Sequence, residues 1–342
     1  MQVSTKPIPK LTVLFLIALL VFQLILLALT TKQNGKLTQQ PGTPLSVRLK
    51  WVNQSQFAGL DVAKAKGLYE DDGLDVTLLE IKQDASFAPD EVASGGVNFG
   101  IVSIGDFIKA MDRGLPVKAL GVTFQNTPVV ILSKKSNPVR SAGDLAGKKV
   151  GVSLSDPDST KILFQTLLRR SGVTESKMTY VPIGFLRPTN VSTGVVDVTT
   201  MFRTDAYVLG GSANEYILLY PENFGVSLYD DVLITSDAFL ASHRDVVKKF
   251  VSDTRKGWEY SFQHPEEAVS IVASVANSQY KDPAFLRYIL DQDKSLIVPN
   301  GGDPIGNMTY FRWKQAFDAF YFSGVASKNL RPETFYINET DL

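Results

Sequence analysis

The stretch LSVRLKWVNQSQFAGLDVAKAKGLYEDDGLDVTLLEI, residues 45–81, decides the fold. Its first seven residues alternate apolar and polar side chains, which is the period of a half-buried strand. A helix is predicted from about Ala58 to Lys66, because Gly67 stands where a helix commonly ends. GLDVTLLEI, from Gly73 to Ile81, predicts a second strand. Strand, helix and strand in succession indicate an α/β protein.

The same alternation continues on the C-terminal side of this stretch. VNFGIV (97–102) and VKALGVTF (117–124) predict two more strands, with a helix between them at 105–113. We therefore expect a largely parallel sheet that is covered by helices.

A second series of strands and helices begins at Val129, and the chain after Asp237 is mostly helical. This order predicts two lobes, with the chain crossing into the second lobe and returning to the first. Lobe 1 would comprise 45–128 and 232–342, and lobe 2 would comprise 129–231. In the helical tail, Trp258, Tyr260 and Trp313 are expected in the core, because their spacing is typical of buried helix faces.

The first 30 residues differ in composition from the rest. Residues 11–30, LTVLFLIALLVFQLILLALT, have few polar side chains and are long enough as a helix to span a bilayer core of about 30 Å. Lys6 and Lys10 precede this stretch and predict a cytoplasmic N-terminus, residues 1–10. We expect a transmembrane anchor or a signal at 11–30, followed by a linker at 31–44. An uncleaved anchor is favoured, because the stretch is long and ends in a poor cleavage site.

The composition excludes several classes of function. Lysine plus arginine and aspartate plus glutamate both number 35, so there is no basic excess of the kind that nucleic-acid binding requires. The absence of cysteine excludes disulfides, thiolate metal sites and cysteine nucleophiles. The two histidines, His243 and His264, are too few for a histidine-rich metal site. We therefore expect no metal, no cofactor and no enzymatic activity.

The candidate ligand contacts follow from the strand ends, because ligands of open α/β sheets bind beyond the carboxyl ends of strands. The first strand is followed by two rings and three amides, a mixture that suits a flat, weakly charged heterocycle. These residues are Trp51, Asn53, Gln54, Gln56 and Phe57. A polar turn with Trp51 packed beneath it is the alternative.

Other strand ends supply further candidates. These are Ser103, Phe124, Gln125, Ser155, Phe202, Arg203 and Asp205. Ser103 and Ser155 both precede predicted helices, so each either caps its helix or binds the ligand. Arg203 either faces the ligand, which would favour an acidic solute, or forms a surface ion pair with little effect on stability.

Several longer phrases resemble one protein family. Residues 51–76, 97–133 and 230–272 are similar to solute-binding proteins of ABC transporters that carry thiamine-precursor pyrimidines, riboflavin and, more distantly, alkanesulfonates and nitrate. The resemblance covers residues 45–342. It implies the type II periplasmic-binding fold, with two α/β lobes, a hinge of two strands and a ligand cleft that Phe124 and Gln125 would face.

The resemblance also implies a function. The chain would be the extracytoplasmic binding component of an ABC importer, would capture an aromatic heterocycle such as a thiamine-precursor pyrimidine or a flavin, and would deliver it to a permease with an ATPase subunit. A binder of a sulfonate, nitrate or aromatic acid, and a sensing module for a signalling partner, are the alternatives. The pyrimidine synthase of thiamine biosynthesis resembles the first block as well. That enzyme needs a histidine at the position of Phe57 and a cysteine-rich segment, and this chain has neither.

Overall fold

The computed structural model describes Gln23 and residues 42–81, 87–153, 157–174, 178–184, 187–299, 302–327 and 330–342. The predicted anchor at 11–30, nearly all of the linker, and Ser155 lie outside the described residues. Within the described ranges, no helix has the length and apolar character needed to cross a membrane. The chain divides into two units, residues 1–42 and 43–342, and both sheets belong to the second unit.

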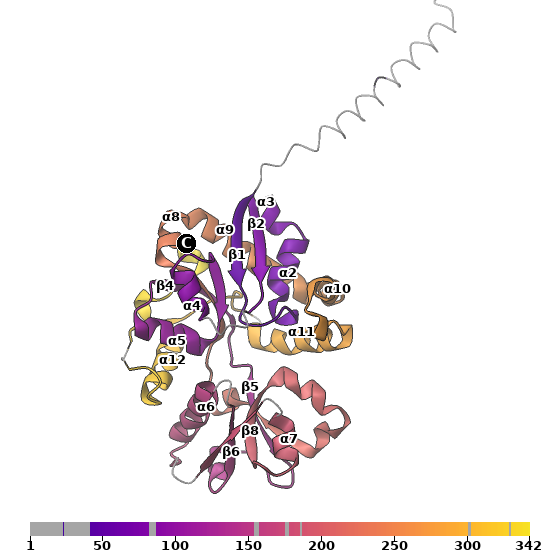
Figure 1. Ribbon diagram of the computed structural model, residues 1–342, viewed down its shortest axis with the longest axis vertical. Helices are drawn as coiled ribbons and strands as arrows, with labels where there is room; N and C mark the ends of the chain where they lie inside the picture. Colours follow the sequence, from indigo (N-terminus) through magenta and orange to yellow (C-terminus); the bar gives the residue numbers. More distant parts are fainter. Residues whose placement is uncertain are drawn as a thin grey trace, which may run out of the picture. The chain divides into compact units, whose positions relative to one another are not determined.

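The first sheet has five strands in the order β2-β1-β3-β10-β4 (Figure 1). β1 (Thr43–Arg48) pairs in parallel with β2 (Leu74–Leu79) and with β3 (Phe99–Val102). β10 (Asp230–Ser236) lies antiparallel between β3 and β4 (Val117–Phe124). The expected largely parallel sheet therefore contains one reversed strand, β10, which the chain enters on its return from the second sheet.

The second sheet repeats this arrangement in the order β7-β6-β8-β5-β9. β6 (Lys149–Ser153) is parallel to β7 (Thr179–Ile183) and β8 (Val198–Phe202), and β5 (Val129–Lys134) lies antiparallel between β8 and β9 (Tyr216–Leu219). The reversed strand is again the one that arrives from the other sheet. The two halves show no sequence repeat, so this shared topology was not visible in the sequence.

Helices cover both sheets. The α-helices are α2 (Ala58–Ala65), α3 (Leu68–Asp71), α4 (Ala88–Ala93), α5 (Ile104–Arg113), α6 (Pro157–Arg170), α7 (Arg187–Ser192), α8 (Asp237–Ser242), α9 (Arg244–Gln263), α10 (Pro265–Val275), α11 (Pro283–Ile297) and α12 (Tyr310–Phe322). The short 3-10 elements are η1 (Ser55–Phe57), η2 (Ala142–Leu145), η4 (Arg203–Glu215), η5 (Pro221–Phe224), η6 (Ser278–Tyr280), η7 (Pro332–Thr334) and η8 (Glu339–Asp341). The sequence did not predict α7, η4 or β9.

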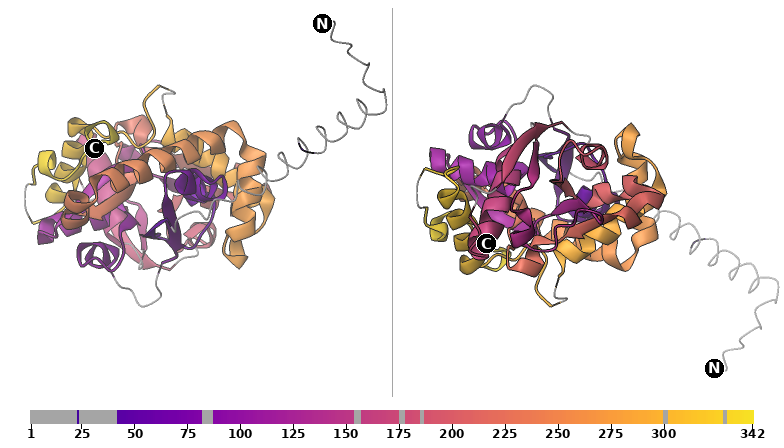
Figure 2. Two further views of the ribbon diagram at one scale, coloured as in Figure 1. Left: turned by 90° about the horizontal axis from the view of Figure 1, so that it is seen from above. Right: turned by 90° about the horizontal axis from the view of Figure 1, so that it is seen from below.

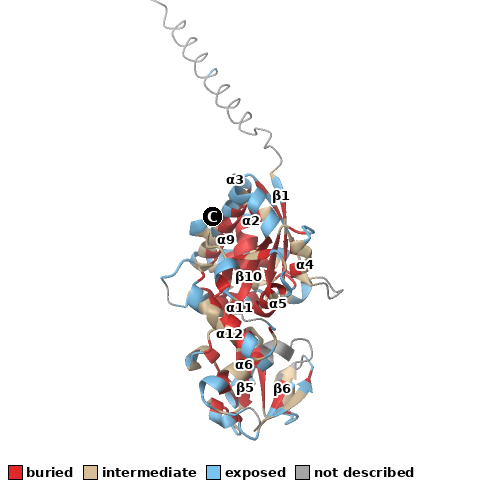
Figure 3. Ribbon diagram, turned by 90° about the vertical axis from the view of Figure 1, so that its left-hand side faces the viewer, coloured by how far each residue is buried: buried red, intermediate tan, exposed pale blue. Residues whose placement is uncertain are grey.

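The hydrophobic core of the first lobe lies on both faces of its sheet. Successive residues of a strand point to opposite faces of its sheet. On β10, Leu233 packs with residues of α2 and α9, whereas Val232 and Ile234 pack with residues of α5 and α12. Figure 3 shows the buried residues concentrated on the strands and on the inward helix faces. Figures 1 and 2 show α11 and α12 on opposite flanks of the first lobe.

Two of the three aromatic residues that were expected in the core are buried. Trp258 and Trp313 are 3% and 0% exposed, as expected. Tyr260 is half-buried, and its hydroxyl donates a hydrogen bond to Glu267 Oε2 at 2.6 Å.

Two connections join the sheets. Residues 125–128 lead from β4 to β5, and residues 220–229 lead from β9 to β10. The proposed lobe limits fall at the first connection and at Asp231, which is the second residue of β10. The limits remain an interpretation of these connections.

Candidate functional site

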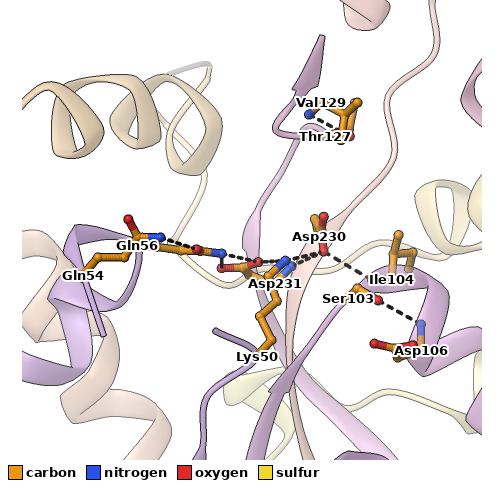
Figure 4. Close-up of polar contacts among 10 residues, drawn as sticks. All are labelled: Lys50, Gln54, Gln56, Ser103, Ile104, Asp106, Thr127, Val129, Asp230 and Asp231. Atoms are coloured by element: carbon orange, nitrogen blue, oxygen red, sulfur yellow. Dashed lines mark hydrogen bonds and ion pairs between the residues drawn. The ribbon is translucent and has the colours of Figure 1, made fainter. Parts of the chain in front are cut away.

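A group of five polar side chains lies at the carboxyl edge of the first sheet, which we name the strand-end cluster: Lys50, Gln54, Gln56, Asp230 and Asp231 (Figure 4). Lys50 Nζ forms ion pairs with Asp230, at 3.0 Å, and with Asp231. Gln56 Nε2 donates to the two carboxylate oxygens of Asp231 at 3.1 and 2.8 Å. Gln54 Nε2 donates to Gln56 Oε1 at 3.2 Å. The cluster joins the end of β1 to the start of β10.

Asp231 has an unusual backbone and an unusual carboxyl group. Its φ of 51° lies in the left-handed region, where residues other than glycine are strained and are often functional. Burial raises the pKa of its carboxyl to about 6, although the Lys50 ammonium opposes this shift. For Lys50, burial acts to lower the pKa, but Asp230 and Asp231 outweigh it and raise the pKa above the ordinary value. Lys50 therefore stays charged at neutral pH.

Trp51 is the accessible ring beside this cluster. It follows Lys50 directly and remains 41% exposed. Its indole Nε1 donates to the hydroxyl of Tyr280 at 3.3 Å. The ring is thus not packed beneath the loop, and it offers an apolar face next to polar side chains.

The other two residues predicted on this loop serve the fold. Asn53 is buried, and its Nδ2 donates to Asp61 Oδ1 at 3.0 Å while its backbone N–H donates to Glu80 Oε1 at 2.8 Å. Phe57 is 2% exposed and packs in the core with residues of β1, α2 and α9. Neither side chain joins the strand-end cluster.

Three further candidates on the first lobe have structural partners. Ser103 Oγ accepts a hydrogen bond from the backbone N–H of Asp106 at 3.0 Å and caps α5. Phe124 is 2% exposed and packs in the cluster that contains Trp258. The Gln125 amide donates to the carbonyl of residue 307 at 3.0 Å and accepts from Arg312 at 3.1 Å. These contacts hold the connection to β5 in place.

The described candidates on the second lobe differ in how far their side chains are exposed. Phe202 is 37% exposed, and its backbone N–H donates to Asp205 Oδ2 at 3.2 Å, which starts η4. Arg203 is 5% exposed, donates to Thr127 O at 3.2 Å and pairs with Glu222 at 2.9 Å. Arg203 is therefore not an exposed surface pair, which was one of the two alternatives from the sequence, and its charge is already matched by a carboxylate.

Sequence reasoning missed four acidic or basic residues at this edge: Lys50, Asp230, Asp231 and Asp293. Asp293, on α11, is 2% exposed, and its Oδ2 has no hydrogen-bond partner among the described residues. Burial and the charge of Asp231 raise its pKa well above the ordinary value, against the opposing charges of Arg203 and Lys50. The adjacent aspartates at the start of a predicted strand were the available signal.

No metal centre accompanies the cluster, since the described residues contain no group of histidines, aspartates and glutamates suited to one. Two surface hollows lie elsewhere. One of about 370 Å³ lies between α6 and α12, and one of about 910 Å³ lies beside α9. Neither hollow is lined by residues of the strand-end cluster. The contacts among these side chains and the exposed Trp51 ring therefore define the candidate site.

Residues 54–268, more than half of the 342 in the chain, match the family described as NMT1/THI5 like. The chain belongs to this family. The match includes Gln54 and Gln56, β10 and every strand of the second sheet.

Three similar proteins are named for thiamine biosynthesis, riboflavin binding and formylaminopyrimidine binding. A Haemophilus influenzae protein named for thiamine biosynthesis is 28% identical over 243 residues, which are 70% of this chain and 76% of the relative. The riboflavin-binding protein RibY of Chloroflexus aurantiacus is 26% identical, covering 72% of this chain and 71% of its own. The formylaminopyrimidine-binding protein of Halalkalibacterium halodurans is 22% identical, covering 79% and 82%.

A second kind of relative is an enzyme. The 4-amino-5-hydroxymethyl-2-methylpyrimidine phosphate synthase of Legionella pneumophila is 23% identical over 274 residues, covering 78% of this chain and 85% of its own. Membership in the family therefore does not by itself separate binding proteins from synthases.

Solved structures show the fold. The periplasmic aliphatic sulphonate-binding protein SsuA of Escherichia coli superposes with a TM-score of 0.69 at 15% identity, over 87% of this chain and 93% of its own. The alkanesulfonate-binding protein SsuA of Xanthomonas axonopodis pv. citri gives 0.64 at 16% identity, over 87% and 99%. The chain has the α/β periplasmic-binding-protein fold with two sheets.

Proposed function

We propose that this protein is the extracytoplasmic solute-binding component of an ABC importer and captures a small heterocyclic solute between its two lobes. The observation that carries this proposal is the strand-end cluster beside the exposed ring of Trp51. A few polar groups next to an apolar face are typical of small-molecule sites in α/β proteins.

The chemistry of the site favours a planar solute with hydrogen-bonding edges. Trp51 offers a face for stacking, and the half-buried Gln54 and Gln56 offer amides. A pyrimidine or a flavin presents a flat ring with donors and acceptors on its rim. The names of the riboflavin-binding and formylaminopyrimidine-binding relatives support the same class.

An anionic solute is the second candidate. Its support is the likeness of fold to sulfonate-binding proteins. An anion needs an available cation, yet Lys50 is shared by two aspartates and Arg203 pairs with Glu222. These pairings favour a heterocycle over a sulfonate, nitrate or aromatic acid.

We propose a binding role rather than catalysis. His243 forms the junction of α8 and α9, and His264 forms the junction of α9 and α10. Both lie between helices and outside the strand-end cluster, so neither supplies a base or a nucleophile-activating group to the cluster. A sensing module is the remaining alternative, and only the partner distinguishes it from a transport protein.

We also propose that residues 11–30 tether the protein at the outer face of the cytoplasmic membrane, with residues 1–10 on the inside. The apolar length of this stretch and the lysines before it support the proposal. The partner on the membrane would be a permease with its ATPase subunit.

A ligand screen tests the proposed function. A pyrimidine or riboflavin should raise the melting temperature of the wild type, because a ligand that binds only the folded state stabilises it. Trp51→Ala should weaken that binding about ten-fold or more, since stacking on an aromatic ring contributes about 1–3 kcal/mol. Calorimetric titration measures the affinity.

Phe311→Ala is the matched control, because Phe311 is an 81% exposed ring on α12. Its affinity should equal that of the wild type. A folded Trp51→Ala variant with wild-type affinity would remove Trp51 from the site, and binding of a sulfonate or nitrate alone would favour the anionic class.

A further inference from the structure

Five aromatic side chains from three separate segments form a continuous row, which we name the aromatic row: Trp51, Tyr280, Phe285, Tyr207 and Tyr288. The indole of Trp51 donates to the Tyr280 hydroxyl at 3.3 Å. The Tyr280 and Phe285 rings stack with centroids 5.9 Å apart. The Tyr207 ring lies 4.9 Å from that of Phe285 and 5.2 Å from that of Tyr288.

The aromatic row crosses from the first lobe to the second. Trp51 follows β1 of the first sheet, whereas Tyr207 lies in η4, directly after β8 of the second sheet. The other three rings come from η6 and α11. The Tyr288 hydroxyl also donates to the carbonyl of Arg203 at 3.4 Å, so α11 contacts the second lobe through polar and apolar groups.

Two rings of the row are accessible. Trp51 is 41% and Tyr207 is 39% exposed, while the other three rings are half-buried. An isolated exposed aromatic ring needs no explanation. Two such rings in one row, on different lobes, form a surface on which a flat molecule can stack.

The donors of the strand-end cluster beside Trp51 are already engaged. Lys50 pairs with both Asp230 and Asp231, and the Gln56 amide donates to Asp231. A solute with amino or ring N–H groups brings its own donors and therefore fits these surroundings better than an anion.

We propose that the aromatic row is the stacking surface for the solute, and that Tyr207 is the ring through which the second lobe contacts it. This inference rests on the proposed function, and it adds the residue on the opposite lobe and the class of solute, an amino-substituted planar heterocycle. Binding then engages both lobes at once, which favours their closed arrangement.

The test uses Tyr207→Ala, Tyr207→Phe and a matched control, Tyr310→Ala. Tyr310 is a tyrosine of similar exposure, 37%, on α12. Affinity for 4-amino-5-hydroxymethyl-2-methylpyrimidine and for riboflavin is measured by calorimetry on the full chain. Tyr207→Ala should weaken binding about ten-fold or more, whereas Tyr207→Phe keeps the ring and should retain most of the affinity.

Fluorescence gives a second readout. The chain has three tryptophans, and Trp258 and Trp313 are 3% and 0% exposed, so iodide should quench Trp51 selectively. The pyrimidine should protect Trp51 from iodide in the wild type and in Tyr310→Ala. Protection at the same pyrimidine concentration should be largely lost in Tyr207→Ala.

The outcomes separate the two proposals. If the wild type binds a heterocycle and Tyr207→Ala binds it equally well, the inference is wrong and the proposed function stands. If the wild type binds neither heterocycle, both proposals fail. If it binds a sulfonate instead, the class of solute assigned to the row is wrong.

Discussion

At the residue scale, the buried pair of Asn53 and Asp61 has more hydrogen-bond acceptors than donors. Asn53 Nδ2 donates to Asp61 Oδ1 at 3.0 Å, but Asn53 Oδ1 and Asp61 Oδ2 are both buried without a partner among the described residues. Burial raises the pKa of the Asp61 carboxyl to about 7, against the hydrogen bond from Asn53. A proton on this carboxyl supplies a donor for these two oxygens, which otherwise have none.

The pair predicts a pH dependence of stability. Asp61 has a higher pKa in the folded state than its ordinary value of 3.8, so its stabilising contribution is complete below about pH 4 and is lost as the pH rises to about 7. Asp61→Asn carries no charge and supplies an N–H donor. It should be more stable than the wild type at pH 8, by at most about 4 kcal/mol.

Urea unfolding at pH 5 and pH 8 checks this prediction. Asp231 and Asp293 also have raised pKa values, so the informative quantity is the difference between variant and wild type at each pH. An Asp61→Asn variant that is less stable than the wild type at pH 8 would contradict the protonated pair.

At the element scale, α2 and α9 approach one another through two glycines. A Cβ on Gly257 would overlap the carbonyl of Gly59 and would lie 2.9 Å from the Cβ of Ala63. A Cβ on Gly59 would overlap the Trp258 ring. The close approach keeps η1 and the loop that carries Trp51 next to β1, so it positions the candidate site.

Gly257→Ala should therefore destabilise the protein by about 3 kcal/mol or more, because the overlapping atom belongs to the backbone and has little freedom to move. Gly143→Ala is the control, since a Cβ there meets only Ser141 Oγ at 3.6 Å. Thermal unfolding of both variants measures the effect. Equal melting temperatures would show that α2 and α9 are less tightly packed than the glycines indicate.

At the scale of the whole molecule, residues 43–342 form a unit of their own. Removal of residues 1–41 should leave the melting temperature and the solute affinity unchanged, because the hydrophobic core clusters of the described residues lie within the second unit. The full chain should be found in the membrane fraction of cells, and the shortened chain should not. If cells that express the full chain release a protein whose mass lacks residues 1–30, the segment is a cleaved signal instead.

The sequence by itself determined the local elements and the family. β4 (117–124) has the limits that its pattern predicted, and α5 (104–113) begins one residue before the predicted helix, because alternation and helical periodicity are properties of neighbouring residues. Short or irregular elements were missed. β9 has only four residues, and η4 contains the glycine pair at 210–211, so neither presents a clear period.

The tertiary structure alone decided which side chains at the strand ends remain available. Lys50 and Asp230 are 180 positions apart, and Trp51 and Tyr280 are 229 apart, so no local pattern relates them. Gln54 and Gln56 reach the strand-end cluster, whereas the neighbouring Asn53 turns inward to Asp61. The residue type at each position was visible in the sequence, but its partner was not, because partners are chosen by contacts between elements that only the folded chain brings together.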